Sequence, residues 1–362
     1  MDTLASLSTT PPRPAPPGIG RPRRIGIFRA RKLGDLLCAT PALRAIAAAW
    51  PGAERVLIGL PWARPLAERW PTVDRFIEFP GWPGLPECPP ELGALPAFLQ
   101  AMQAERFDLL LQLHGSDGRV NPLLAACGAM QLAGFAAADE AVLDPALGVR
   151  WPEQGSQAER LLALTDHLGL PRAGTALDFP LRGADRDALR RCWPAVDEPQ
   201  PYVCVHPGAR LPTRRWPVAS FAALADRIAA RGWRVVLAGS AAETRLTDAV
   251  RDAMQQPAVD LAGRTDLWTL GALIQRAALL VCNDTGVSHI AAALDTPSVI
   301  VSCGADAARL APADARRQVV LWQPAACRPC QHAHCPVGHG CATGLAVPVV
   351  DRAVRQQLGV AA

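Results

Sequence analysis

One polar stretch between two apolar runs holds residue types and spacings that suit chemistry. Residues 283–289 read NDTGVSH, with the apolar run 277–282 before them and 290–294 after them. The first run predicts a buried strand and the second predicts the first turns of a helix. A strand-to-helix turn gathers free backbone N–H groups and the positive end of the helix dipole, so it suits a phosphate. Asp284 and His289 add an acceptor and a titratable donor.

A basic segment lies at the predicted start of another helix. Thr213, Arg214 and Arg215 precede Trp216-Pro217 and a helix expected over 218–230. Cations are disfavoured at a helix N-terminus, so two arginines there call for an explanation. They are either exposed charges or partners of a bound anion. We favour the anion, because the turn at 283–289 indicates a phosphate site in the same half of the chain.

A carboxylate follows the first expected strand, over residues 24–29. Asp35 comes after Gly34 and starts a helix, so by local sequence it resembles an N-cap, for which Asp is a preferred residue. Arg31 and Lys32 lie in the same turn. They form either a solvated basic loop or a contact with an anionic ligand.

Two further residues each have two interpretations. Glu243 follows Gly239 closely, and it is either a charge near a helix start or part of a nucleotide site. His114 lies at the end of the expected strand 107–115, and it is either a plain strand end or part of a ligand site.

Four cysteines fall within fifteen residues: Cys327, Cys330, Cys335 and Cys341, with His332, His334 and His339 between them. Such a set can make a tetrahedral thiolate site, although the spacing matches no familiar zinc motif. The alternatives are a structural zinc, or thiols that are either reduced or redox-linked. We expect this cysteine-rich segment (327–341) to lie outside the chemistry.

The bulk composition narrows the class of protein. A chain of 362 residues with 50% hydrophobic residues favours two globular domains. A net charge of +4 is too small to indicate nucleic acid binding. No apolar run reaches the ~20 residues of a membrane span. The Pro-rich start, residues 1–20, lacks the features of a signal peptide, so we expect a cytoplasmic protein with reduced cysteines.

Strands alternate with helices in both halves of the chain, which predicts parallel α/β sandwiches. The expected strands are 24–29, 55–60, 107–115, 202–206, 233–239, 277–282 and 298–301. One helix is expected from Leu36 to Trp50. We predict a disordered tail (1–22), an N-terminal domain (23–178), a linker (179–200), a C-terminal domain (201–345) and a final helix (346–362). Ligands would bind in the cleft between the domains.

The chain resembles glycosyltransferase family 9, the ADP-heptose:lipopolysaccharide heptosyltransferases. The resemblance is carried by Asp35 after the first strand, by Trp216-Pro217 after the segment 206–208 (HPG), and by the Asp-Thr-Gly-x-x-His of 284–289. It covers roughly residue 24 to the C-terminus. It implies a GT-B fold of two Rossmann-like domains, with acceptor in the first and nucleotide sugar in the second. It also implies inversion at the anomeric carbon without a metal.

The resemblance also implies roles for the donor side. Arg214 stands where the family usually has Lys, two residues before the Trp, and either it or Arg215 would contact the diphosphate. Thr213 belongs to the same segment. Thr285 and Gly286 would bind the diphosphate, Asp284 and His289 would shape the donor pocket, and Glu243 would accept from the ribose hydroxyls.

On the acceptor side, the family's proposed general base corresponds to Asp35, which would take the proton of the acceptor hydroxyl. Arg31, Lys32, Gly34 and His114 would line this side. A final helix would pack back on the first domain. No cofactor is expected to be required, and a structural zinc is the one metal considered.

These implications predict a transferase that moves heptose from ADP-heptose to a lipopolysaccharide core acceptor. Membrane contact would be peripheral, through the lipid-linked acceptor. One alternative is a related transferase with another nucleotide sugar or glycan, and another is a non-catalytic glycan-binding relative. An NAD-dependent oxidoreductase is disfavoured, because residues 28–34 (FRARKLG) lack the Gly-x-Gly-x-x-Gly motif.

Overall fold

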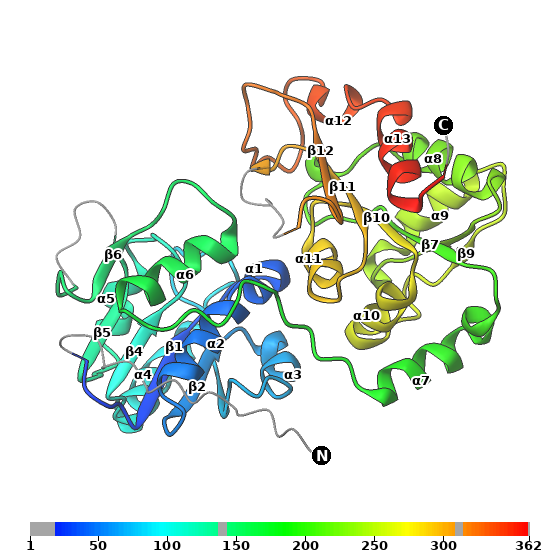
Figure 1. Cartoon of the computed structure of the whole chain (residues 1–362). Coiled ribbons are helices and arrows are strands. Elements are labelled where there is room, and N and C mark those ends of the chain that lie inside the picture. Colours follow the sequence, from blue (N-terminus) through cyan, green and yellow to red (C-terminus); the bar gives the residue numbers. More distant parts are fainter. Residues whose placement is uncertain (1–18, 137–142, 308–313, 361–362) are drawn as a thin grey trace, which may run out of the picture. The chain divides into compact units, whose positions relative to one another are not determined.

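A computed structural model describes residues 19–136, 143–307 and 314–360 of the chain (Figure 1). The chain divides into two compact units. Unit 1 consists of Met1–Arg31, Pro41–Pro152 and Leu161–Gly174, and unit 2 consists of Lys32–Thr40, Glu153–Arg160 and Thr175–Ala362. Most of the predicted tail, residues 1–18, lies outside the described residues.

Unit 1 is built on a parallel sheet of six strands in the order β3-β2-β1-β4-β5-β6. In that order the strands are Arg75–Glu78, Glu54–Gly59, Arg24–Phe28, Leu109–Gln112, Gln131–Ala136 and Gly148–Arg150. Its helices are α3 (Arg64–Ala67), α4 (Leu95–Glu105), α5 (Val120–Ala125) and most of α2 (Thr40–Ala49) and α6 (Gln157–His167), whose first residues belong to unit 2, with short 3-10 turns η1 (Pro61–Ala63) and η2 (Leu92–Ala94).

Unit 2 repeats this plan with the strand order β12-β11-β10-β7-β8-β9. In that order the strands are Gln318–Trp322, Ser298–Ser302, Leu279–Asn283, Tyr202–His206, Arg234–Leu237 and Val259–Asp260. The helices are α1 (Leu33–Leu37), α7 (Gly183–Cys192), α8 (Val218–Ala230), α9 (Thr244–Ala253), α10 (Leu267–Arg276), α11 (Gly286–Ala293), α12 (Gly340–Thr343) and α13 (Val347–Leu358), with turns η3 (Pro194–Asp197), η4 (Pro212–Arg214) and η5 (Ala241–Glu243).

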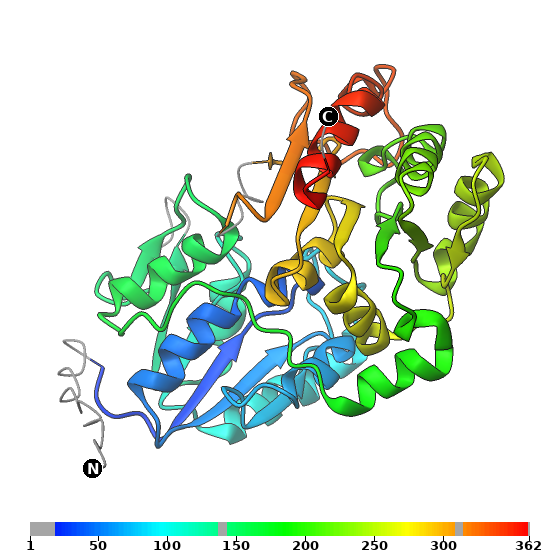
Figure 2. The same ribbon diagram turned by 45° about the vertical axis from the view of Figure 1, so that its right-hand side comes forward.

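The central strands β4, β7 and β10 are buried along their whole length because helices cover both faces, as in other parallel sheets. Figures 1 and 2 show helices on both sides of each sheet. In unit 2, alternate residues of β7 and β10, such as Val203 and Val281, face Phe221 of α8 and Val354 of α13 in one core cluster. The buried face of α13 therefore belongs to unit 2, which corrects the expectation that the final helix packs on the first domain.

The single helix expected from Leu36 to Trp50 is two helices. The first, α1, ends at Leu37, and α2 begins at Thr40. Pro41 explains the break, because proline lacks the N–H that would bond the carbonyl of Leu37 and its ring clashes with that carbonyl. The hydroxyl of Thr40 donates to the Leu37 carbonyl instead, at 2.7 Å. The break separates α1, which packs on α11 in unit 2, from α2.

Each sheet has one topological switch point, where successive strands are added on opposite sides. In unit 1 it lies between β1 and β4, and in unit 2 between β7 and β10. Loops diverge at the carboxyl ends of such strand pairs and leave room for a ligand. The prediction of two Rossmann-like units of a GT-B protein is confirmed. The predicted domain boundaries stay predictions, and the stretch expected as a linker contains α7.

No helix within 19–136, 143–307 and 314–360 has the length and apolar character needed to cross a membrane.

Candidate active site

The switch point of unit 2 is held together by a buried asparagine. Asn283 ends β10 and is 0% exposed. Its Oδ1 accepts from the backbone N–H of Trp216 at 2.9 Å, and its Nδ2 donates to the carbonyl of Pro207 at 2.7 Å. The loop after β7 is therefore fixed to the end of β10. Sequence analysis listed Asn283 without a role, although an amide at the end of an apolar strand is a signal of such a bond.

The basic segment of the sequence lies in this fixed loop. Thr213 and Arg214 belong to the turn η4, and Thr213 is buried. Arg214 donates from Nη2 to a backbone carbonyl, and Arg215 donates from Nε to the carbonyl of Ala209 at 2.9 Å. The Nε of Arg214 is buried and has no hydrogen-bond partner among the described residues. A guanidinium donor without a partner makes Arg214 a candidate for binding an anion.

The turn after β10 has the form that the sequence predicts. Thr285 is the N-cap of α11, and its side chain makes no capping hydrogen bond with a described residue. Gly286, Asp284 and Thr285 are each partly exposed. Arg214 lies in the loop after β7, and the N-terminus of α11 follows the neighbouring strand β10. Asn283 holds the two loops together. The arrangement suits a diphosphate.

Asp35 lies on α1, which packs against α11 within unit 2 (Figure 1). The N-cap of α1 is Lys32, and Asp35 lies in the first turn, so the capping alternative is wrong. Two glycines allow the close approach. A Cβ on Gly34 would lie 2.7 Å from Nδ1 of His289, and one on Gly286 would lie 3.1 Å from Cβ of Leu33. Asp35 and His289 therefore lie on two helices, α1 and α11, that pack against each other.

His289 lies between these helices and is partly exposed. Burial alone would lower its pKa, but the charge and the hydrogen bond of the Cys38 sulfur, together with the carboxylates of Asp284 and Asp35, raise the pKa to about 9. The imidazole is therefore protonated at neutral pH. Sequence analysis missed Cys38. Its position three residues after Asp35, on one side of a helical turn, was the available signal.

A cavity of about 570 Å³ in unit 2 is lined in part by Cys38, Ser288 and His289. Arg214, Thr285 and Asp35 are not among its lining residues. We therefore do not place the donor in this cavity.

Glu243 closes a turn at the end of β8. Its Oε2 accepts from the backbone N–H and the hydroxyl of Ser240, both at 2.8 Å, which makes a capping box. Its Oε1 lies beside Gly208, where a Cβ would come within 1.9 Å of it. Burial alone would raise the pKa of Glu243, but His206, 3.8 Å away, and the bonds from Ser240 lower it. The structural role is thus evident, and the ribose role stays a prediction.

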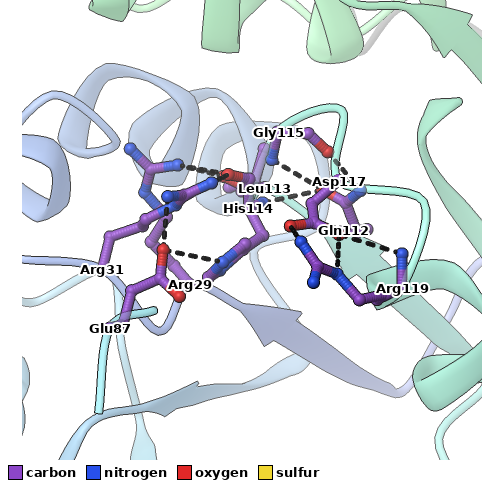
Figure 3. A network of polar contacts seen from close by, with 9 residues as sticks. All are labelled: Arg29, Arg31, Glu87, Gln112, Leu113, His114, Gly115, Asp117 and Arg119. Atoms are coloured by element: carbon purple, nitrogen blue, oxygen red, sulfur yellow. Dashed lines mark hydrogen bonds and ion pairs between the residues drawn. The ribbon is translucent and has the colours of Figure 1, made fainter. Parts of the chain in front are cut away.

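Two of the predicted acceptor residues meet at the switch point of unit 1 (Figure 3). Arg31 follows β1 and donates from Nε and Nη2 to the carbonyl of His114, which follows β4, at 3.0 and 2.9 Å. Arg31 also pairs with Glu87, whose Oε1 lies 3.5 Å from Nε2 of His114. Lys32, in unit 2, is exposed. Arg31 therefore shapes the loop after β4 as well as adding charge.

His114 gives unit 1 a pH-dependent stability. Burial, the first cause, lowers its pKa to about 4, while Glu87 opposes the change. Because the native state binds this proton less tightly than the unfolded state, stability is full above pH 6.5 and falls as the pH drops toward 4. We expect a contribution of ~3 kcal/mol to that loss. Denaturant unfolding from pH 4 to 7 should show a smaller loss in His114→Phe, whose ring can still pack on Phe28.

The exposed His167 of the same unit supplies the control for this measurement. His167→Phe should keep the acid dependence of the parent chain. A parent-like dependence in His114→Phe would contradict the assignment.

The cysteine-rich segment gives no support for a metal centre. Within the part of the chain that the structure describes, no three His, Cys, Asp or Glu side chains are grouped to hold a metal ion. Cys327, Cys330, Cys335 and Cys341 are free thiols. The structural zinc stays an untested prediction, and no step below depends on it.

Comparisons with known proteins show what the chain is similar to. The model of a family described as glycosyltransferase family 9 (heptosyltransferase) matches residues 96–340. Lipopolysaccharide heptosyltransferase 2 of Salmonella typhimurium is 29% identical over 286 residues, which cover 74% of this chain and 79% of that protein.

Two solved structures share the fold. A glycosyl transferase family 9 protein from Veillonella parvula has a TM-score of 0.77 at 18% identity and covers 93% of this chain and 97% of its own. The E. coli ADP-heptose LPS heptosyltransferase II has a TM-score of 0.72 at 20% identity, with 92% and 98% covered.

Proposed function

The chain belongs to glycosyltransferase family 9, and on that premise we propose that it transfers heptose from ADP-heptose to a lipopolysaccharide core acceptor with inversion at the anomeric carbon. Membership of this family makes the chain a glycosyltransferase. The choice of donor rests on the solved relative whose title names ADP-heptose and on the curated relative named as a lipopolysaccharide heptosyltransferase.

One observation carries the donor part of the proposal. Asn283 binds the loop that carries Arg214 to the strand that leads into α11, so this loop and the N-terminus of α11 lie at one switch point. Both attract anions, and a diphosphate has the size to meet both. As ADP departs, negative charge grows on its β-phosphate. Preorganised donors at that point stabilise the transition state.

Asp35 supplies the base. In the proposed step the acceptor oxygen attacks the anomeric carbon while the bond from that carbon to the phosphate oxygen breaks. The hydroxyl proton passes to the carboxylate of Asp35, and ADP leaves with the bonding electrons. The protonated His289 on the neighbouring helix favours the ionised carboxylate that a base requires. Loop closure around the donor would exclude water, which would otherwise hydrolyse it.

The acceptor part of the proposal rests on charge. The inner core of lipopolysaccharide carries carboxylates and phosphates, and Lys32 and Arg31 precede the base in sequence. Arg31 already binds Glu87 and the carbonyl of His114, so we assign it to positioning the loop after β4. In this proposal the chain meets the membrane only through its lipid-linked acceptor.

A nucleotide panel tests the donor assignment. The melting temperature is measured with ADP, UDP, GDP, CMP and NAD at equal concentrations, because a ligand that binds only the native state stabilises it by ~2.7 kcal/mol at a hundredfold excess over Kd. We expect ADP to give the largest rise. A larger rise with UDP or GDP would replace the donor and keep the transferase. No rise with any nucleotide would favour a non-catalytic relative.

A further inference from the structure

The cysteine-rich segment packs behind the loop that carries Arg214. The backbone N–H of Cys330 donates to the carbonyl of Gly304 at 2.6 Å. Gly304 has a φ of +67°, and a Cβ there would lie 3.2 Å from Cβ of Cys330 and 3.5 Å from the carbonyl oxygen of Thr213. A glycine is thus required where three segments meet. These contacts place the cysteine-rich segment beside the loop that carries Arg214.

Three hydrogen bonds join the segment to Thr213 and Arg214. The hydroxyl of Thr213 donates to the carbonyl of His332 at 2.6 Å, and Nη2 of Arg214 donates to the carbonyl of Cys330 at 3.3 Å. The third bond is made by a side chain of the segment. Nε2 of His339 lies 2.8 Å from the carbonyl oxygen of Thr213. Since a carbonyl only accepts, Nε2 of His339 carries the hydrogen.

The backbone of His339 is itself fixed. It is the N-cap of α12 with a φ of 59°, in the left-handed region. Its N–H donates to Sγ of Cys335 at 3.1 Å, and its carbonyl accepts from Ala342 at 2.9 Å. The ring therefore reaches Thr213 from an anchored position and does not pay the full entropy of a free side chain.

We propose that His339 is a positioning residue for the donor site: by holding the carbonyl of Thr213 it fixes the turn η4, and with it the direction in which Arg214 meets the diphosphate. The proposal rests on the proposed function for the identity of the ligand. The cysteine-rich segment binds both the hydroxyl and the carbonyl of Thr213, which precedes Arg214 in the sequence. Asn283 binds the backbone N–H of Trp216, which follows it. Arg214 is thus flanked in the sequence by two residues that hydrogen bonds hold in place.

Two measurements on the full chain test this proposal. Calorimetry gives the affinity for ADP, and hydrogen–deuterium exchange gives the protection of the amides of Arg214 and Arg215, which donate within η4. His339→Ala should weaken ADP binding by about tenfold, the effect of one lost hydrogen bond in a rigid site, and should speed the exchange of both amides. His339→Gln, whose amide nitrogen can donate to the same carbonyl, should recover most of both losses.

His334→Ala is the matched control, because His334 is an exposed histidine of the same segment. It should match the parent chain in both measurements. Unchanged exchange at Arg214 and Arg215 in His339→Ala would overturn the proposal, and so would equal losses in His339→Gln. A parent chain that does not bind ADP would refute the donor assignment alone, since the exchange result decides the positioning role without a nucleotide.

Discussion

Replacing Asp35 with Asn should lower kcat by about 10²–10⁴-fold, the range for loss of a general base. The amide keeps the shape of the side chain but cannot take the proton of the acceptor hydroxyl. Because Asp35 acts on the acceptor in this account, the affinity for ADP should change by no more than about threefold (~0.7 kcal/mol). Steady-state kinetics of transfer and calorimetry with ADP measure the two quantities separately.

Asp252→Asn is the control for this substitution, since the side chain of Asp252 is 73% exposed in the same unit. It should leave kcat unchanged. If Asp35→Asn kept a kcat within about threefold of the parent chain, Asp35 would not be the base. Equal melting temperatures in the two variants would show that any loss is chemical.

Replacing His289 with Gln should remove a stabilisation that depends on alkaline pH. The native pKa of His289 is about 9, above its ordinary 6.5, so the native state holds this proton more tightly than the unfolded state. The resulting stabilisation is full below pH 6.5 and is lost as the pH rises through 9. A difference of this size corresponds to ~3 kcal/mol. The parent chain should therefore lose stability between pH 7 and 10 more steeply than the variant.

Denaturant unfolding at several pH values across that range measures the effect. The exposed His334 again gives a control, and His334→Gln should show the pH dependence of the parent chain. The same alkaline slope in His289→Gln would show that the imidazole is not the group that titrates. His289→Gln should also lower kcat, because Asp35 and Asp284 lose the cation between them.

Local sequence patterns predicted the helices and strands whose bounds depend on local residue types. The strand β7 and the helix α8 match their predicted bounds, because a run of β-branched residues and a Trp-Pro helix start leave little choice. The single helix predicted from Leu36 to Trp50 was wrong, because the prediction did not use the break that Pro41 causes. The alternation of strands and helices gave the two parallel units.

The contacts that shape the site could not be read in this way. The bonds from Thr213 to His332 and His339 join residues 119 and 126 positions apart. No periodicity in a single sequence reports such distances. Cys38 was missed for a related reason, because its importance comes from His289 on a helix far along the chain. Single residues with a chemical signature, such as Asp35, could be proposed from the sequence, and their supporting partners could not.

The most direct test of the central claim is a transfer assay with ADP-heptose and a heptose-free lipopolysaccharide core acceptor. The anomeric configuration of the product is determined by NMR, alongside the release of ADP. We expect one ADP per heptose transferred and an inverted anomeric centre in the product. Transfer with retained configuration would contradict the mechanism assigned to Asp35, and transfer only from another nucleotide sugar would contradict the donor.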